Sequence, residues 1–208
     1  MSTSAVSICN LALAEIGEKP IRDLGESNER SRMCNYLYES CRNRQLSAFD
    51  WGFARRTATL QKLDQDHARG TPYQIPSDCL APRSLHPQVK TKRTFFIEGQ
   101  KIIVPDYLVV EGVDLHLVYT RKETDASFYT QDFIEVLTLD LASRLAGPIA
   151  SDLKLAASKK KEMKLAQIEA YSNDASFDSE YPVHDENPHN DSFVNPENWG
   201  EGNLDYTD

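Results

Sequence analysis

The 208-residue sequence lacks a long apolar run, and no stretch approaches the ~20 residues that a membrane-spanning helix needs. We therefore expect no membrane partner. The apolar N-terminal stretch has no basic leader and is interrupted by Glu15, which predicts an amphipathic helix rather than a secretory signal peptide. A chain of this length can bury a hydrophobic core without disulfides or metals.

Cysteine is scarce, and its four positions include no C-x-x-C pair: Cys9, Cys34, Cys41 and Cys79. On one helix, Cys34 and Cys41 would be separated by a rise of ~10 Å, whereas a disulfide requires Cα atoms within about 7 Å. We expect all four to be reduced and buried as small apolar residues. This expectation points to an intracellular place of synthesis.

Familiar catalytic and cofactor-binding motifs are missing as well. There is no G-x-S-x-G, Walker, dinucleotide-binding or H-E-x-x-H pattern, and His184 and His189 leave only a weak alternative metal site. Carboxylates are plentiful, so a glycosidase-like pair remains an alternative. The best-placed acids, however, fit helix surfaces or first turns, where the helix dipole favours them: Glu15, Glu39, Asp132 and Glu135. We expect a protein that is not an enzyme and holds no cofactor or metal.

Basic residues are absent after Lys164. Residues 1–164 hold all 23 basic residues and 21 of the 32 acidic ones, a net charge of +2, whereas residues 165–208 hold 11 acidic residues and no basic one. A near-neutral body argues against a general nucleic-acid binder, which would show a basic excess. The acidic end either meets a basic surface or keeps the chain soluble.

Apolar residues recur at helical spacing in four segments, which predicts helices over about 3–16, 27–49, 130–147 and 153–171. Side chains that can cap the first turn stand at three of the starts: Thr3 or Ser4, Ser27 or Asn28, and Asp152.

Between the second and third segments the apolar period changes to two, which predicts strands. An alternating strand over 57–63 is followed by short, proline-broken strands at 73–75 and 79–85. The run 95–104 has β-rich halves on either side of Gly99 and predicts a hairpin. A last strand over 113–120 places four residues on one face: Val113, Leu115, Leu117 and Tyr119.

This order predicts an α+β fold. We expect residues 1–54 and 128–172 to form an antiparallel bundle of about four helices, residues 55–127 to form an inserted antiparallel β lobe, and residues 173–208 to form an extended acidic arm. The arm is rich in Asp, Asn, Ser, Glu and Pro, which is typical of a segment that does not fold alone. Aromatic residues are nevertheless spread through it and are our candidates for partner-binding anchors: Phe177, Tyr181, Phe193, Trp199 and Tyr206.

Two further groups stand near the end of the second helix. Trp51 and Phe53 flank a turn and are expected to pack in the seam between the two lobes. Arg42, Arg44, Arg55 and Arg56 form one basic group, and Lys159–Lys161 form another. The simpler interpretation of both groups is that they are solvated helix faces paired with local acidic residues. The functional alternative is contact with DNA or with the acidic arm of a neighbouring subunit.

Four stretches, in order, resemble the head-to-tail adaptor proteins of short-tailed phages. They are S-I-C-N-L-A-L-A-E-I-G at residues 7–17, C-N-Y-L-Y at 34–38, D-W-G-F-A at 50–54 and Y-Q-I-P-S-D-C-L at 73–80. Residues 133–149 are also similar to the penultimate helix of that family. The resemblance covers roughly residues 4–171, and the β insertion is similar to that of the tail tubular protein A type. The stretches are packing motifs rather than catalytic ones, and the arm does not match by motif.

The resemblance implies a structural subunit of the virion, made in the host cytoplasm. It implies a homo-oligomeric ring, a dodecamer in the family, that docks under the portal protein, stands above a tail nozzle protein and lets DNA pass. The helical bundle would form the ring, the β lobe would face the nozzle and the C-terminal arm would bind the portal. Two alternatives remain: a virion-associated enzyme that degrades peptidoglycan, and a DNA-contacting plug, whose binding would depend steeply on salt.

Overall fold

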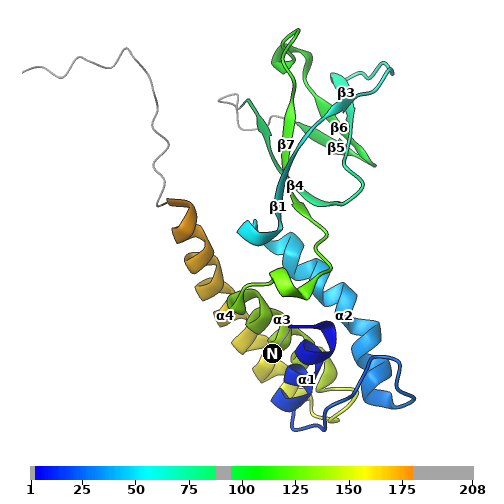
Figure 1. Ribbon diagram of the computed structural model, residues 1–208, viewed down its shortest axis with the longest axis vertical. Helices are drawn as coiled ribbons and strands as arrows, with labels where there is room; N and C mark the ends of the chain where they lie inside the picture. Colours follow the sequence, from blue (N-terminus) through cyan, green and yellow to red (C-terminus); the bar gives the residue numbers. More distant parts are fainter. Residues whose placement is uncertain (1–2, 88–94, 180–208) are drawn as a thin grey trace, which may run out of the picture.

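The computed structural model describes residues 3–87 and 95–179 and shows an α+β protein with four α-helices and two small antiparallel sheets (Figure 1). The helices are α1 (Ala5–Glu15), α2 (Glu29–Ala48), α3 (Gln131–Leu145) and α4 (Leu153–Ser179). The strands all lie between α2 and α3 in the described chain. In Figure 1 the helices occupy the lower end of an elongated molecule and the sheets the upper end. The expected α+β class is confirmed.

The helices begin where the sequence offers side-chain caps. Ser4 accepts a hydrogen bond from the Ser7 amide, and Asn28 accepts one from the Ser31 amide. Asp152 Oδ1 accepts the amides of the second and third residues of α4, both at 2.9 Å. These bonds satisfy first-turn amides that no helical carbonyl can reach. The caps expected at Ser4, Asn28 and Asp152 are confirmed.

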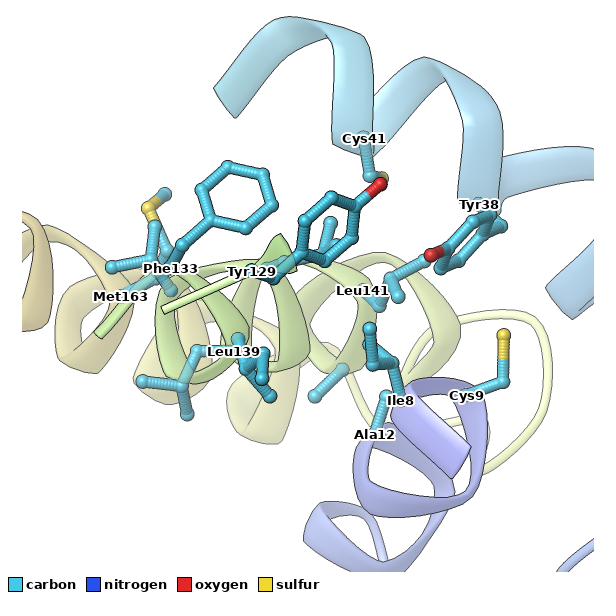
Figure 2. Close-up of a cluster of buried hydrophobic side chains, with 14 of the residues drawn as sticks. Ile8, Cys9, Ala12, Tyr38, Cys41, Tyr129, Phe133, Leu139, Leu141 and Met163 are labelled. Atoms are coloured by element: carbon cyan, nitrogen blue, oxygen red, sulfur yellow. The ribbon is translucent and has the colours of Figure 1, made fainter. Parts of the chain in front are cut away.

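The helix α3 packs against each of the other three helices. Its buried face includes the apolar residues expected from the helical spacing: Phe133, Val136, Leu137, Leu141 and Leu145. Figure 2 shows side chains from α1, α2 and α3 gathered in this core, among them Ile8, Ala12, Tyr38, Cys41 and Leu141. The helix α3 therefore ties the other helices into one core.

The first sheet has the order β1-β7-β4, and the second has the order β2-β3-β6-β5. The strands are β1 (Arg55–Thr59), β2 (Gln61–Lys62), β3 (Thr71–Gln74), β4 (Cys79–His86), β5 (Phe96–Glu98), β6 (Lys101–Val104) and β7 (His116–Arg121). The predicted hairpin is confirmed: β5 pairs with β6 from Phe96 opposite Ile103 to Glu98 opposite Lys101. Gly99 turns between them with φ of +61°, a conformation that glycine adopts without strain.

The strand expected over 57–63 is wrong as a single element. It divides at Leu60, so that β1 belongs to one sheet and β2 to the other. Leu60 is buried between them, and its amide donates to the Leu115 carbonyl at 2.7 Å. The expected start of the last strand is also wrong, because β7 begins at His116 and Val113 stays 45% exposed before it.

The expected boundary between the last helix and an extended arm is also wrong, because α4 continues to Ser179. Asn173 Nδ2 donates to Asp132 Oδ2 at 3.1 Å, and Asp174 Oδ2 accepts the Gly52 amide at 3.1 Å. These polar contacts hold the helix where the apolar period has ended. Residues 173–179 are therefore helical, and residues 180–208 lie outside the described residues.

The four cysteines are free thiols. Cys9, Cys34 and Cys41 are buried in the helical core, as expected. Cys79, at the start of β4, is only partly buried, so the expectation of burial is wrong for this residue. Partial burial raises the pKa of Cys79 to about 11, with Asp78 contributing in the same direction, and the thiol is therefore protonated at neutral pH.

Candidate functional site

Trp51 follows α2 and is fully buried. Its Nε1 donates to the Gln45 carbonyl at 2.9 Å. Its ring meets those of Phe133 and Tyr171 edge-on, with centroids 5.1 and 5.6 Å apart. Because these partners lie on α3 and α4, Trp51 is part of the helical core. Phe53 is half-buried beside it, 5.1 Å from the Phe133 ring.

Arg83 of β4 joins the first sheet to the end of α2. Its Nη2 donates to the carbonyls of Leu46 and Ser47 at 3.2 and 3.1 Å and also to the Phe49 carbonyl. Its Nε donates to Thr120 Oγ1 of β7 at 2.8 Å. The last turn of α2 contains no basic residue of its own. The guanidinium therefore supplies, from a distant strand, the positive charge and the donors that a helix C-terminus favours.

Asp50 lies beside this guanidinium. Its carboxylate is 3.1 Å from Arg55 Nε and 3.8 Å from Arg83 Nε. Burial lowers the pKa of Arg83, while the Asp50 carboxylate acts in the opposite direction and favours the charged form. Sequence patterns miss Arg83 because it stands in a proline-broken strand more than thirty positions after its carbonyl partners.

The structure does not bring the four predicted arginines together at one surface. Arg42 is buried, donates to Asn43 Oδ1 at 2.9 Å and lies over the Tyr38 ring. Arg44 pairs with Asp140 of α3, and Arg55 pairs with Asp50. Arg56 is exposed and donates to the carbonyls of Arg55 and Phe53. Each of these arginines therefore has a local structural partner.

Asp140 is the centre of a polar network between α2, α3 and α4. The residue is 1% exposed, pairs with Arg44, and lies 3.4 Å from Arg144 Nε. Gln45 Nε2 donates to it at 3.0 Å, and Gln167 of α4 donates to Gln45 Oε1 at 2.7 Å. A buried carboxylate requires such partners. A cavity of about 300 Å³ opens beside the network and is also lined by Ser143, Lys160 and Met163.

The three consecutive lysines of α4 lie in different surroundings. Lys159 Nζ lies 2.6 Å from Glu15 of α1 and 2.9 Å from Glu162. The hydrogen bonds that Lys159 donates to these two carboxylates raise its pKa. Lys160 lines the cavity beside Asp140, and Lys161 is exposed. The first lysine thus ties α4 to α1, and the others remain available at the surface.

Three of the four candidate catalytic acids have different partners, and Asp132 and Glu135 are neighbours on the surface of α3. Glu15 pairs with Lys159, Glu39 pairs with Lys122 at 2.6 Å, and Asp132 accepts from Asn173. Hydrogen bonding to Lys122 lowers the pKa of Glu39. Glu135 is exposed on α3. Within residues 3–87 and 95–179, no group of three His, Cys, Asp or Glu residues is placed to hold a metal ion. No helix in that part of the chain is long and apolar enough to cross a membrane.

The predicted anchors fall at or beyond the end of α4. Phe177 lies within the helix, and its side chain is not described. The other four anchors and the two histidines of the acidic end lie outside the described residues: Tyr181, Phe193, Trp199, Tyr206, His184 and His189. The contacts of the arm therefore stay predictions.

No protein-family model matches the chain, and no curated protein matches it.

Proposed function

We propose that the protein is a structural head-to-tail connector of a phage virion, a ring-forming adaptor between the portal and the tail nozzle. In this proposal the four helices act as an antiparallel bundle that forms the ring. The β lobe of residues 55–127 faces the nozzle, and the acidic chain after α4 is an extended arm that binds the portal. DNA passes through the ring, which is a dodecamer in the family that the sequence resembles.

The observation that carries the proposal is the division between a tightly bonded body and an acidic end. The helix α4 runs for 27 residues, about 40 Å at 1.5 Å per residue, directly to Ser179. The 29 residues that follow contain eight acidic residues and no basic one. A segment of this composition that orders on binding can cover a large surface, with its aromatic residues as anchors.

The body has the properties that a ring subunit needs. The buried carboxylate of Asp140 is paired with Arg44 and Arg144 of the same chain, so it needs no partner from another subunit. The near-neutral charge of residues 1–164 suits a ring through which a duplex slides without being gripped. These features favour a structural role over an enzymatic or DNA-binding one.

Removal of residues 180–208 tests the proposal. The truncated protein should keep the far-UV circular dichroism and melting temperature of the full chain, because every described contact precedes residue 180. It should fail to co-sediment with rings of the portal protein encoded by the same genome. A matched variant with Phe193→Ala and Trp199→Ala, which keeps every charge, separates aromatic anchoring from electrostatic attraction. Co-sedimentation of the truncated protein at the level of the full chain would reject the proposed role of the arm.

A further inference from the structure

Two surfaces of the helical part have no partner within the described chain. The first is the outer face of α4, where Leu165 and Ile168 are 60% and 69% exposed. They stand three residues apart and are therefore neighbours on the helix surface. Lys161 and Lys164 are exposed one turn earlier, four residues before Leu165 and Ile168 respectively. We call these four residues the α4 patch.

The α4 patch points away from the rest of the protein. Met163 and Ala170 are the buried residues of this helix and belong to the core shared with α3. At 100° per residue, Leu165 and Ile168 lie on roughly the opposite side of the helix from Met163. A single chain therefore cannot cover this patch with α3.

The second surface is a groove between α1 and the first turn of α3. It has a volume of about 480 Å³ and is lined mainly by Ser7, Ile8, Leu11, Gln131 and Ile134. Leu11 is 50% exposed at its edge. We call this surface the α1/α3 groove. Its volume falls in the range of cavities that accept sizeable apolar groups.

The charges at the two surfaces are complementary. Glu135 is exposed one turn after Gln131 on α3, which places a carboxylate at the border of the groove. The α4 patch has Lys161 and Lys164 one turn before its apolar pair and the exposed Glu169 one turn after Leu165, so the lysine end of the patch is the end that complements Glu135.

We propose that the α4 patch of one copy docks in the α1/α3 groove of the next copy. Because the two surfaces differ and lie on separate parts of the chain, the contact is heterologous: each subunit keeps one free patch or one free groove after pairing. Repetition of such a contact closes a ring or extends a filament. The inference rests on the proposed function, since it identifies the subunit contact of the ring.

Mixing two complementary variants tests the contact. Leu165→Glu with Ile168→Glu disables the patch and leaves the groove intact, whereas Leu11→Glu disables the groove and leaves the patch intact. Each change is at an exposed side chain, so circular dichroism and melting temperature should match the unchanged protein. Each variant alone should self-associate at least about 30-fold more weakly in sedimentation velocity, as expected for a central apolar anchor. The two variants mixed should form a 1:1 dimer and nothing larger.

Control variants separate this contact from non-specific association. Tyr107→Glu changes an exposed aromatic residue of the β part, 76% exposed, and should leave assembly unchanged. Glu135→Lys should weaken assembly, and mixing it with a Lys161→Glu/Lys164→Glu variant should restore part of it. A mixture of patch and groove variants that stays monomeric overturns the inference, as does an unchanged protein that is monomeric at hundreds of micromolar. Undiminished assembly of either variant also overturns it.

The outcome is distinguishable from failure of the connector function. Subunits that assemble through the patch and groove but do not bind portal rings would reject the connector and keep the contact. Subunits that bind portal equally well with Leu165→Glu and Ile168→Glu, and still form rings there, would keep the connector and reject the contact.

Discussion

The helical part and the β part of this protein are held together in different ways. The helices share one continuous core, and most of the largest fully buried side chains belong to it, including Trp51, Phe133 and Leu141. The sheets share a smaller core around Ile102 and Leu117, and their strands are two to eight residues long. Short strands with a small core gain little stability alone. The β part therefore depends on its attachment to α2, while the helical part depends on its own packing.

Among single changes, Trp51→Ala should cause the largest loss of stability, and it should do so by disrupting the helical core. It removes a fully buried ring that contacts α3 and α4, and it leaves the Gln45 carbonyl without its donor. Such truncations cost about 3–5 kcal/mol of unfolding free energy. Urea unfolding followed by circular dichroism measures the loss, with Trp51→Phe as a milder control. A loss below about 1 kcal/mol would show that the aromatic cluster is not a centre of the helical core.

Arg83→Met should loosen the β part from the helices with a smaller global effect. It removes charged donors from three carbonyls at the end of α2 and leaves Asp50 with less compensation. Hydrogen bonds to charged groups are worth about 1.5–3 kcal/mol, so we expect a loss of about 2–3 kcal/mol. Hydrogen exchange should quicken in β4 and β7 more than in α3.

The matched control is Arg83→Lys, which keeps the positive charge but lacks the planar guanidinium donors that bond several carbonyls at once. Its exchange rate in β4 should lie between those of the unchanged protein and Arg83→Met. Equal protection of β4 in all three proteins would mean that the sheets hold their position without this residue.

Ile102→Val probes the smaller core. Ile102 is fully buried on β6, and losing one methylene there should cost about 1 kcal/mol. A matched Leu141→Ile change on α3 conserves volume in the helical core. If the two parts unfold as one unit, both changes shift the midpoint of a single urea transition. The dependence of the unfolding free energy on urea concentration (the m-value) then stays the same. If the β part unfolds first, only Ile102→Val lowers the midpoint of a separate early transition.

Tyr119→Phe should have the smallest effect and should act mainly at alkaline pH. Burial, together with a hydrogen bond to Asp78, raises the pKa of Tyr119 to about 12. A pKa raised in the folded state stabilises the protein below the unfolded value of about 10, and this stabilisation is lost as pH rises toward 12. The variant should therefore lose less stability between pH 10 and 12. Urea unfolding at several pH values between 10 and 12 measures this, and an equal fall of unfolding free energy with pH in both proteins would contradict it.

Local rules predicted the helix starts and the hairpin, because Asn28, Asp152 and Gly99 act on residues only a few positions away. They missed features that depend on distant partners. The alternating run around Leu60 carries no sign that its two halves join different sheets, since the switch is set by pairing with β7 and β3. The last turns of α4 have no apolar period and are held by contacts with Asp132 and Gly52.

The candidate site was harder to predict than the fold. Nearness in sequence groups the basic residues around the end of α2, but Arg42 and Arg44 leave the helix in different directions and find different partners. Arg83, which organises that region, belongs to a strand whose prolines indicate only an edge. The exposed pair on α4 is recognisable only when the buried side of the helix is known.

The hydrogen bonds between Arg83 and the end of α2 have a mechanical consequence. Tension applied to the β part along the long axis of the molecule passes to the helices through the covalent links between α2 and β1 and between β7 and α3. The guanidinium adds a third anchor, because it is bonded both to the sheet and to the last carbonyls of α2. A third anchor restricts rotation about the other two, so we expect the β part to move together with the helices under load.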